Sequence, residues 1–130
     1  MPDEPEKSME QVIREDGRYP PEAYAFLREG LNRAVEAVYG KRPLPGQGHI
    51  TGQQLCLALR DLAIENWGML APTVLKRWNI HATVDFGNMV YLLVNNSLMG
   101  KTPEDSIEDF RGVYDFATAF DIGEEFDLKE

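Results

Sequence analysis

The stretch VDFGNMVYLLVNNSLMG (residues 84–100) decides the fold class. Its centre, Met89 to Val94, is an unbroken apolar run that alone would fit either a buried strand or a buried helix. Asp85 stands where a helix N-cap is expected, and Gly100 stands where a helix terminator is expected. The segment between these two signals is much longer than a typical strand. The pattern therefore predicts a mostly buried helix over residues 86–99.

Helical signals continue on both sides of this stretch. Apolar residues recur at helical spacing, capping residues or prolines open the segments, and glycines close most of them. No window keeps the alternation of a strand, so at most a small β-hairpin is expected. The predicted fold is all-α, a compact bundle of about five helices. The predicted segments are a short helix at 9–16, then 20–39, 51–67, 72–78, 86–99 and 103–111, with one further turn in 113–120.

Two of these segments supply much of the predicted core. The apolar residues of 20–39 that share one helical face are Tyr24, Leu27, Leu31, Val35 and Val38. The apolar stripe of 51–67 consists of Leu55, Leu59, Leu62 and Ala63. Because Leu57 and Ile64 point away from that stripe, we expect this second helix to lie between neighbours on two sides.

Several single residues have a structural interpretation. Glu29 and Arg33 are spaced to form an i,i+4 ion pair. Cys56 lies on the apolar stripe, where a buried and inert thiol is expected. Trp67 and Trp78 flank the short helix 72–78 and are predicted to anchor the core rather than to form a ligand cage.

Length and composition predict one domain over residues 1–130. The ordered core is expected at about 18–120, with residues 1–8 and 123–130 frayed. A single cysteine excludes an internal disulfide and is typical of a reducing compartment. The N-terminus has no apolar signal segment and no run is long enough to span a membrane, so we predict a cytoplasmic protein without a membrane partner.

The net charge of −9 is concentrated near the C-terminus. Residues 1–102 hold 12 acids and 11 bases, whereas 103–130 hold ten acids against Arg111 and Lys129. The same segment contains aromatic residues, which predicts that part of it packs on the domain. A basic surface of a partner protein is the expected ligand. The predicted interaction residues are Glu104, Asp105, Glu108, Asp109, Asp115 and Asp121, with Lys76 and Arg77 on the predicted helix 72–78.

Two other functions remain open at this stage. Asp61 and Glu65 are spaced as an i,i+4 carboxylate pair that acid–base catalysis could use, although a structural ion pair is the competing interpretation. The order helix, turn, helix over 72–99 is similar to a helix-turn-helix or winged-helix core. However, no basic residue lies between Phe86 and Gly100, and the excess of acids disfavours nucleic acid as a partner. A basic face that included Lys76, Arg77 and Lys101 would favour nucleic-acid binding.

Cofactor and metal motifs are incomplete. The segment Gly100-Lys101-Thr102 resembles the end of a phosphate-binding loop, but Asn95 replaces the first glycine of that motif. The glycines of 46–52 have the wrong spacing for a dinucleotide loop. His49, His81 and Cys56 show no metal-ligand spacing. We therefore predict no cofactor and no metal. The sequence favours a small non-catalytic protein, an adaptor or regulatory interaction module.

Four stretches together resemble an uncharacterised family of small proteins restricted to planctomycetes and verrucomicrobia. They are RYPPEAYAFLREGL (18–31), GQQLCLALRDLAIENWG (52–68), VLKRWNIHATVDFGNMVYLLV (74–94) and GKTPEDSIEDFRGVYDFATAF (100–120). The resemblance implies a stand-alone bacterial cytosolic domain. It carries over no functional residue, so the loop 43–49 and both ends of the chain keep no assigned role.

Overall fold

The computed structural model describes residues 6–45 and 47–121, and these residues form helices without any strand. The all-α bundle of about five helices is confirmed. The predicted fraying of 123–130, and of 1–5 within 1–8, lies outside the described part of the chain. The helices are α1 (Met9–Asp16), α2 (Pro21–Tyr39), α3 (Gly52–Trp67), α4 (Ala71–Arg77), α5 (Thr83–Asn95) and α6 (Phe116–Ala119), with 3₁₀ turns η1 (Gly68–Leu70) and η2 (Ile107–Phe110).

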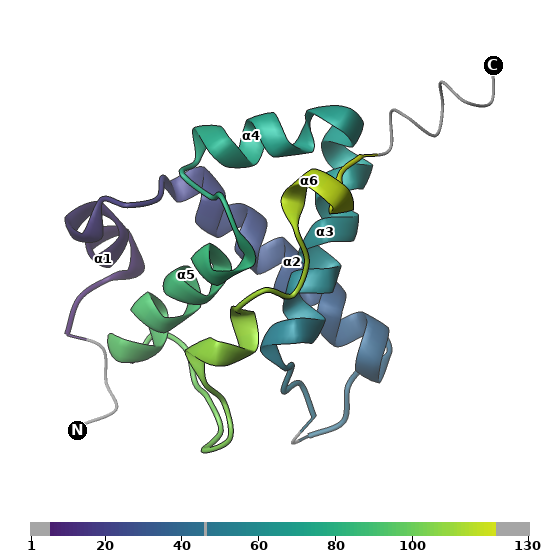
Figure 1. Cartoon of the computed structure of the whole chain (residues 1–130). Helices are drawn as coiled ribbons and strands as arrows, with labels where there is room; N and C mark the ends of the chain where they lie inside the picture. The colour runs from purple at the N-terminus through teal and green to yellow at the C-terminus, as the bar shows by residue number, and fades with distance from the viewer. Residues whose placement is uncertain (1–5, 46, 122–130) are drawn as a thin grey trace.

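Helix α3 is central in its packing, because it contacts α2, α4, α5 and η2. Figure 1 shows it running beside α2. Thr51 opens α3 with a capping box: its hydroxyl accepts the N–H of Gln54, whose side chain accepts the N–H of Thr51. Leu59 and Leu62 of this helix are buried. Its central position is confirmed, but Leu57 is 41% exposed, so the second apolar side is only partly covered.

An aromatic cluster joins the helices on one side of α3. The ring of Phe26 lies 5.2 Å from that of Trp67 and 5.7 Å from that of Trp78, between centroids. The two tryptophans meet edge to face at 5.4 Å, and Phe86 of α5 lies 6.5 Å from Phe26. Such contacts add to the free energy of burying the rings. The prediction that both tryptophans anchor the core is consistent with this packing.

Helix α5 begins and ends earlier than predicted. It starts at Thr83, so Asp85 is its third residue rather than its N-cap, and the Asp85 carboxylate accepts the N–H of Ala82. It ends at Asn95, because Ser97 adopts a left-handed φ of 60°. The N–H of Leu98 then reaches back to the Leu93 carbonyl at 2.8 Å, which is the Schellman pattern. The prediction that Gly100 ends this helix is therefore wrong.

The predicted helix 103–111 is wrong for its first half. Residues 103 and 104 form a turn, residues 105 and 106 are irregular, and within 103–111 only η2 is helical, with Ser106 as its N-cap. Two glycines allow η2 to approach the bundle closely. A Cβ on Gly52 would lie 2.8 Å from the Asp109 Cβ, and one on Gly87 would lie 2.6 Å from Ile107 Cδ1. Long-range packing therefore determines this segment more than its local helix-start signals do.

The segment after η2 returns over α5 and α3. The buried hydroxyl of Thr83 donates to the Phe110 carbonyl at 2.6 Å and accepts the N–H of Val113 at 3.2 Å. The Tyr114 hydroxyl donates to the Cys56 carbonyl at 2.7 Å. Phe120 is buried. The prediction that part of this acidic segment packs on the domain is confirmed for the aromatic residues up to Phe120, and Phe126 lies outside the described residues.

The predicted face of α2 holds only for its first half. Tyr24 and Leu27 are buried, but Val38 is 44% exposed. Arg33 does not pair with Glu29 as predicted. It makes a two-point ion pair with Glu65 of α3 instead, at 2.6 and 2.7 Å, because α2 and α3 pack side by side.

Candidate binding groove

A hollow of about 540 Å³ lies between α1, the N-terminus of α2 and the C-terminus of α4. We call it the arginine groove. Its walls are formed by Glu10, Ile13, Arg14, Gly17, Arg18, Tyr19, Pro20, Pro21, Arg77, Trp78 and Asn79. Segments far apart in the sequence meet here, because the turn between α1 and α2 packs against the turn that follows α4.

The charge of the arginine groove is opposite to that of the whole chain. Arg14, Arg18 and Arg77 line it, and Glu10 is the single acid among its lining residues. Arg18 is paired: its Nε donates to Asp16 at 3.0 Å, which raises the pKa of the guanidinium. Its guanidinium also lies over the ring of Tyr19, 5.6 Å from the centroid. Within residues 6–45 and 47–121, Arg14 and Arg77 form no ion pair.

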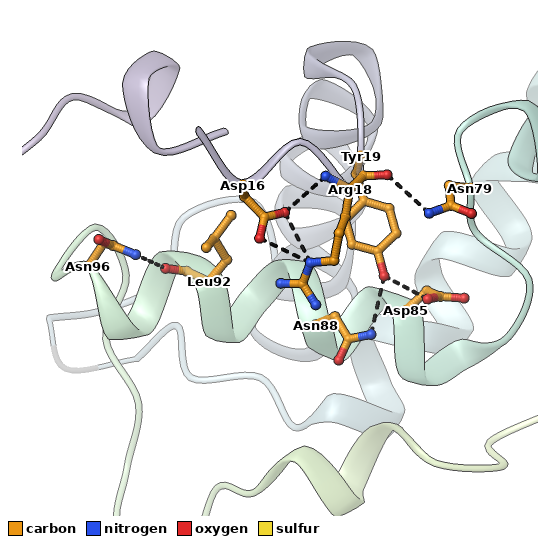
Figure 2. Close-up of polar contacts among 8 residues, drawn as sticks. All are labelled: Asp16, Arg18, Tyr19, Asn79, Asp85, Asn88, Leu92 and Asn96. Carbon is orange, nitrogen blue, oxygen red and sulfur yellow. Dashed lines mark hydrogen bonds and ion pairs between the residues drawn. The ribbon is translucent and has the colours of Figure 1, made fainter. Parts of the chain in front are cut away.

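A polar network holds one wall of the arginine groove in place (Figure 2). The hydroxyl of Tyr19 donates to the Asp85 carboxylate at 2.6 Å and accepts an N–H of Asn88 at 3.2 Å. The other oxygen of Asp85 accepts the backbone N–H groups of His81 and Ala82, at 2.8 and 3.1 Å. The carboxylate thus ties the first turn of α5 to the entrance of α2.

Asn79 makes the second link between the two turns. Its Nδ2 donates to the Arg18 carbonyl at 3.2 Å, and its Oδ1 lies 3.1 Å from His81 Nε2. Asn79 has a φ of 66°, a conformation that asparagine tolerates better than most residues. It closes α4 by a Schellman turn, in which the N–H of the buried Ile80 reaches the Leu75 carbonyl at 2.9 Å.

The network affects the acidity of Tyr19. Burial, followed by donation to Asp85, raises the pKa of Tyr19 to about 12. The phenol therefore stays protonated near neutral pH and keeps donating to the carboxylate. This wall of the arginine groove is rigid because its hydrogen bonds satisfy one another.

Two of the acidic residues predicted to bind a partner are bound to their own backbone. Asp105 accepts the N–H of Thr102 at 2.7 Å, and Asp109 accepts the N–H of Ser106 at 3.1 Å. Asp105 also lies 3.3 Å from His49 Nε2. These carboxylates close turns, and both are half-buried.

The other predicted acidic residues are exposed. Glu108 pairs with Arg111 at 2.9 Å, and Asp115 caps α6 by accepting the N–H of Ala117. Glu104 and Asp121 are exposed and form no ion pair with a described residue. The structure therefore does not gather the six acids into one binding site.

Each member of the predicted carboxylate pair, Asp61 and Glu65, forms an ion pair with a different arginine. Asp61, 57% exposed in its side chain, pairs with Arg60, and Glu65, 60% exposed, pairs with Arg33. The hydrogen bonds from Arg33 lower the pKa of Glu65, whereas a catalytic acid needs a raised one. This geometry favours the structural interpretation of both residues.

The basic residues that would support nucleic-acid binding do not form one face. Lys76 and Arg77 close α4, at the top of Figure 1, whereas Lys101 lies in the segment after α5 and lines a different hollow from Arg77. Lys101 lines a second hollow of about 140 Å³ beside His49 and Asp105. The two glycine-containing loops of the sequence meet there, but the acids that line this hollow oppose the binding of a phosphate.

Metal and thiol chemistry find no support in the geometry. Among the described residues, no three His, Cys, Asp or Glu side chains are close enough to hold a metal ion. Cys56 is fully buried, and burial raises the pKa of its thiol to about 12. Within the described part of the chain, no helix combines the length and hydropathy needed to cross a bilayer.

The arginine groove was not predicted from the sequence. Tyr19 and Asp85 are 66 residues apart, and no spacing rule connects them. In the sequence, the segment Arg18-Tyr19-Pro20-Pro21 predicts the start of a helix and nothing about a binding site. Comparison of the chain with family models, curated proteins and solved structures found no match.

Proposed function

We propose that the protein is a non-catalytic interaction module that binds an acidic, extended segment of a partner protein in the arginine groove. The observation that carries the proposal is the gathering of Arg14, Arg18 and Arg77 around one hollow of a chain whose net charge is −9. The proposal agrees with the predicted class of function, a non-catalytic interaction module. It places the binding site in this groove instead of in the acidic C-terminal segment.

The electrostatics of the groove favour carboxylates. Arg14 and Arg77 are exposed and have no acidic partner among the described residues, so an incoming carboxylate needs to displace no existing ion pair. Guanidinium groups bind carboxylates by two parallel hydrogen bonds. Because the groove is open to solvent, this attraction should weaken as salt is added.

The remaining walls suit a peptide chain. Trp78 is half-buried and Ile13 is buried, while Pro20 and Pro21 present rigid apolar surface. Aromatic and arginine side chains together are the usual anchors of protein interfaces. The groove is smaller than a standard interface, so we expect a transient complex with micromolar affinity.

The groove is also preorganised. The hydrogen bonds of Tyr19 to Asp85 and of Asn79 to Arg18 fix the two turns before a ligand arrives. A rigid site loses less conformational entropy on binding. These two contacts should therefore raise the affinity by holding in place the walls that Tyr19 and Asn79 form.

Nucleic acid is the competing ligand of the same groove. It is disfavoured because α5, the helix in the position of a recognition helix, carries no basic residue. The net charge of −9 would also repel a long polyanion more strongly than a short acidic peptide.

The proposal is tested by fluorescence anisotropy with a labelled peptide of glutamate and leucine, about ten residues long, of which a few extended residues would lie in the groove. We expect micromolar binding that falls as NaCl rises from about 50 to about 500 mM. The double variant Arg14→Glu/Arg77→Glu should weaken binding about tenfold or more, because two attractive contacts become repulsive.

Lys41→Glu/Arg42→Glu is the matched control, since both residues are exposed and outside the groove and the double change alters the net charge by the same amount. Equal loss of affinity in the control would show a general charge effect and contradict the proposal. A single-stranded oligonucleotide that binds more tightly than the peptide, and is sensitive to the same double variant, would assign the groove to nucleic acid.

A further inference from the structure

We infer that a third hollow, between α1, α2 and the end of α5, binds a small molecule with an apolar body and an anionic head. This site is separate from the arginine groove and does not depend on the proposed function. Its volume is about 190 Å³. We call it the methionine cavity. Its apolar walls are Met9, Leu27, Leu31, Leu93, Leu98 and Met99.

The fold creates this cavity at the end of α5. The left-handed turn at Ser97 stops the helix and brings Leu98 and Met99 back toward α2. Helix α1 packs against both α2 and α5 and supplies Met9 from its first turn (Figure 1). Leu27 and Leu93 line the hollow and are otherwise part of the buried core.

The size and lining of the cavity predict an apolar ligand. Protein interiors rarely leave voids larger than a water molecule. An engineered apolar cavity of about 150 Å³ stays dry and binds benzene or xenon. The methionine cavity has a comparable volume but is partly open to solvent, and its lining exposes little polar surface. Methionine side chains can also adjust to ligands of different shape.

Arg28 gives the cavity its charge preference. It is exposed at the rim, and Met9 Sδ, 3.9 Å from Nη2, is the hydrogen-bond partner of its guanidinium. Within residues 6–45 and 47–121 it forms no ion pair. A carboxylate head there would meet an unpaired cation while its hydrocarbon chain leaves water. Tyr24 also lines the cavity, but its hydroxyl is inaccessible to solvent, so we give it no part in binding.

The test uses octanoate as the probe and methionine methyl NMR as the readout. The full chain is labelled at its methionine methyl groups. Octanoate should shift the resonances of Met9 and Met99, which line the cavity, and leave that of Met69 unchanged, because Met69 is exposed in η1 outside it. If Met9 and Met99 do not move, or if Met69 moves as much as they do, the inference is wrong.

Two variants and a neutral probe test the role of the head group. Arg28→Gln should weaken octanoate binding about fivefold, as expected for one exposed charge pair, and leave the binding of 1-octanol unchanged. Arg42→Gln, a surface change elsewhere, should alter neither. Octanoate binding that is equal in Arg28→Gln and the wild type would contradict the inference that the ligand has an anionic head.

Vesicles of phosphatidylglycerol are the last probe, measured by the same methionine methyl resonances. If they perturb Met9 and Met99 while octanoate does not, the surface binds lipid and the inference of a small ligand fails.

Discussion

Replacing Tyr19 with phenylalanine should destabilise the protein, whereas the same replacement at Tyr24 should not. Both rings are buried, at 4% and 5% exposure, and they pack edge to face with centroids 6.5 Å apart. Their hydroxyl groups differ. That of Tyr19 donates to Asp85 at 2.6 Å, while that of Tyr24 is buried without a partner among the described residues. Comparing the two substitutions therefore measures how much the hydrogen bond from Tyr19 to Asp85 contributes to the free energy of unfolding, because the two rings have similar surroundings.

The expected magnitudes follow from these contacts. A hydrogen bond to a charged group contributes about 1.5–3 kcal/mol. Asp85 is only half-buried and keeps two backbone donors, so we expect Tyr19→Phe to lower the free energy of unfolding by about 1–2 kcal/mol. An unpartnered buried hydroxyl is itself a cost, so Tyr24→Phe should be neutral or stabilising by up to about 1 kcal/mol.

Urea unfolding followed by far-UV circular dichroism measures both changes. With a slope of about 2 kcal/mol per M, Tyr19→Phe should lower the midpoint by about 0.5–1 M and Tyr24→Phe should leave it equal or higher. Asp85→Asn offers a further comparison, because it keeps the shape of the side chain and removes the charge. Equal losses of unfolding free energy in Tyr19→Phe and Tyr24→Phe would refute the reasoning. The loss would then not depend on the hydrogen bond to Asp85, which only Tyr19 forms.

Three other predictions follow from the described contacts. The pKa of Tyr19 is raised from 10 to about 12 in the folded state, so its contribution to stability is complete below pH 10 and is lost as the pH rises through 12. Between pH 10 and 12, the free energy of unfolding should therefore fall less steeply with pH in Tyr19→Phe than in the wild type. Leu59→Ala should cost about 2–5 kcal/mol in urea unfolding, because Leu59 is fully buried and packs on Gly30; a midpoint that barely moves would show that α3 is not central. Cys56 should react slowly with N-ethylmaleimide until urea unfolds the protein, since its thiol is buried and its pKa is about 12; rapid labelling of the native protein would contradict that burial.

Local signals in the sequence were sufficient for the helices that begin and end by local chemistry. Helix α1 ends at Gly17, with a left-handed φ of 72°, as predicted. Helix α3 follows its N-cap Thr51, the residue with which the predicted segment 51–67 begins. In both cases the side chain or glycine that determines the boundary lies within one turn of it, so the sequence alone contains the necessary information.

The same signals failed where packing decides the backbone. Gly100 is a better helix terminator than Ser97 by intrinsic preference, yet the turn at Ser97 lets Leu98 bond back to the Leu93 carbonyl. Proline at 103 and the acids after it are typical of a helix start. The close approach of η2 to Gly52 and Gly87 holds that segment in turns instead. Neither contact is visible in a sequence window.

The candidate site was harder to predict because charge along the chain is a poor guide to charge on the surface. The acids of 103–121 are concentrated in sequence, but Asp105, Asp109 and Asp115 bind backbone N–H groups of their own turns. The arginines of the groove are dispersed in sequence and become neighbours only when two turns pack together. A short segment rich in carboxylates can close its own turns, whereas a basic groove requires the whole fold. The arginine groove is therefore where we expect the protein to meet a partner, although most of its excess charge lies elsewhere.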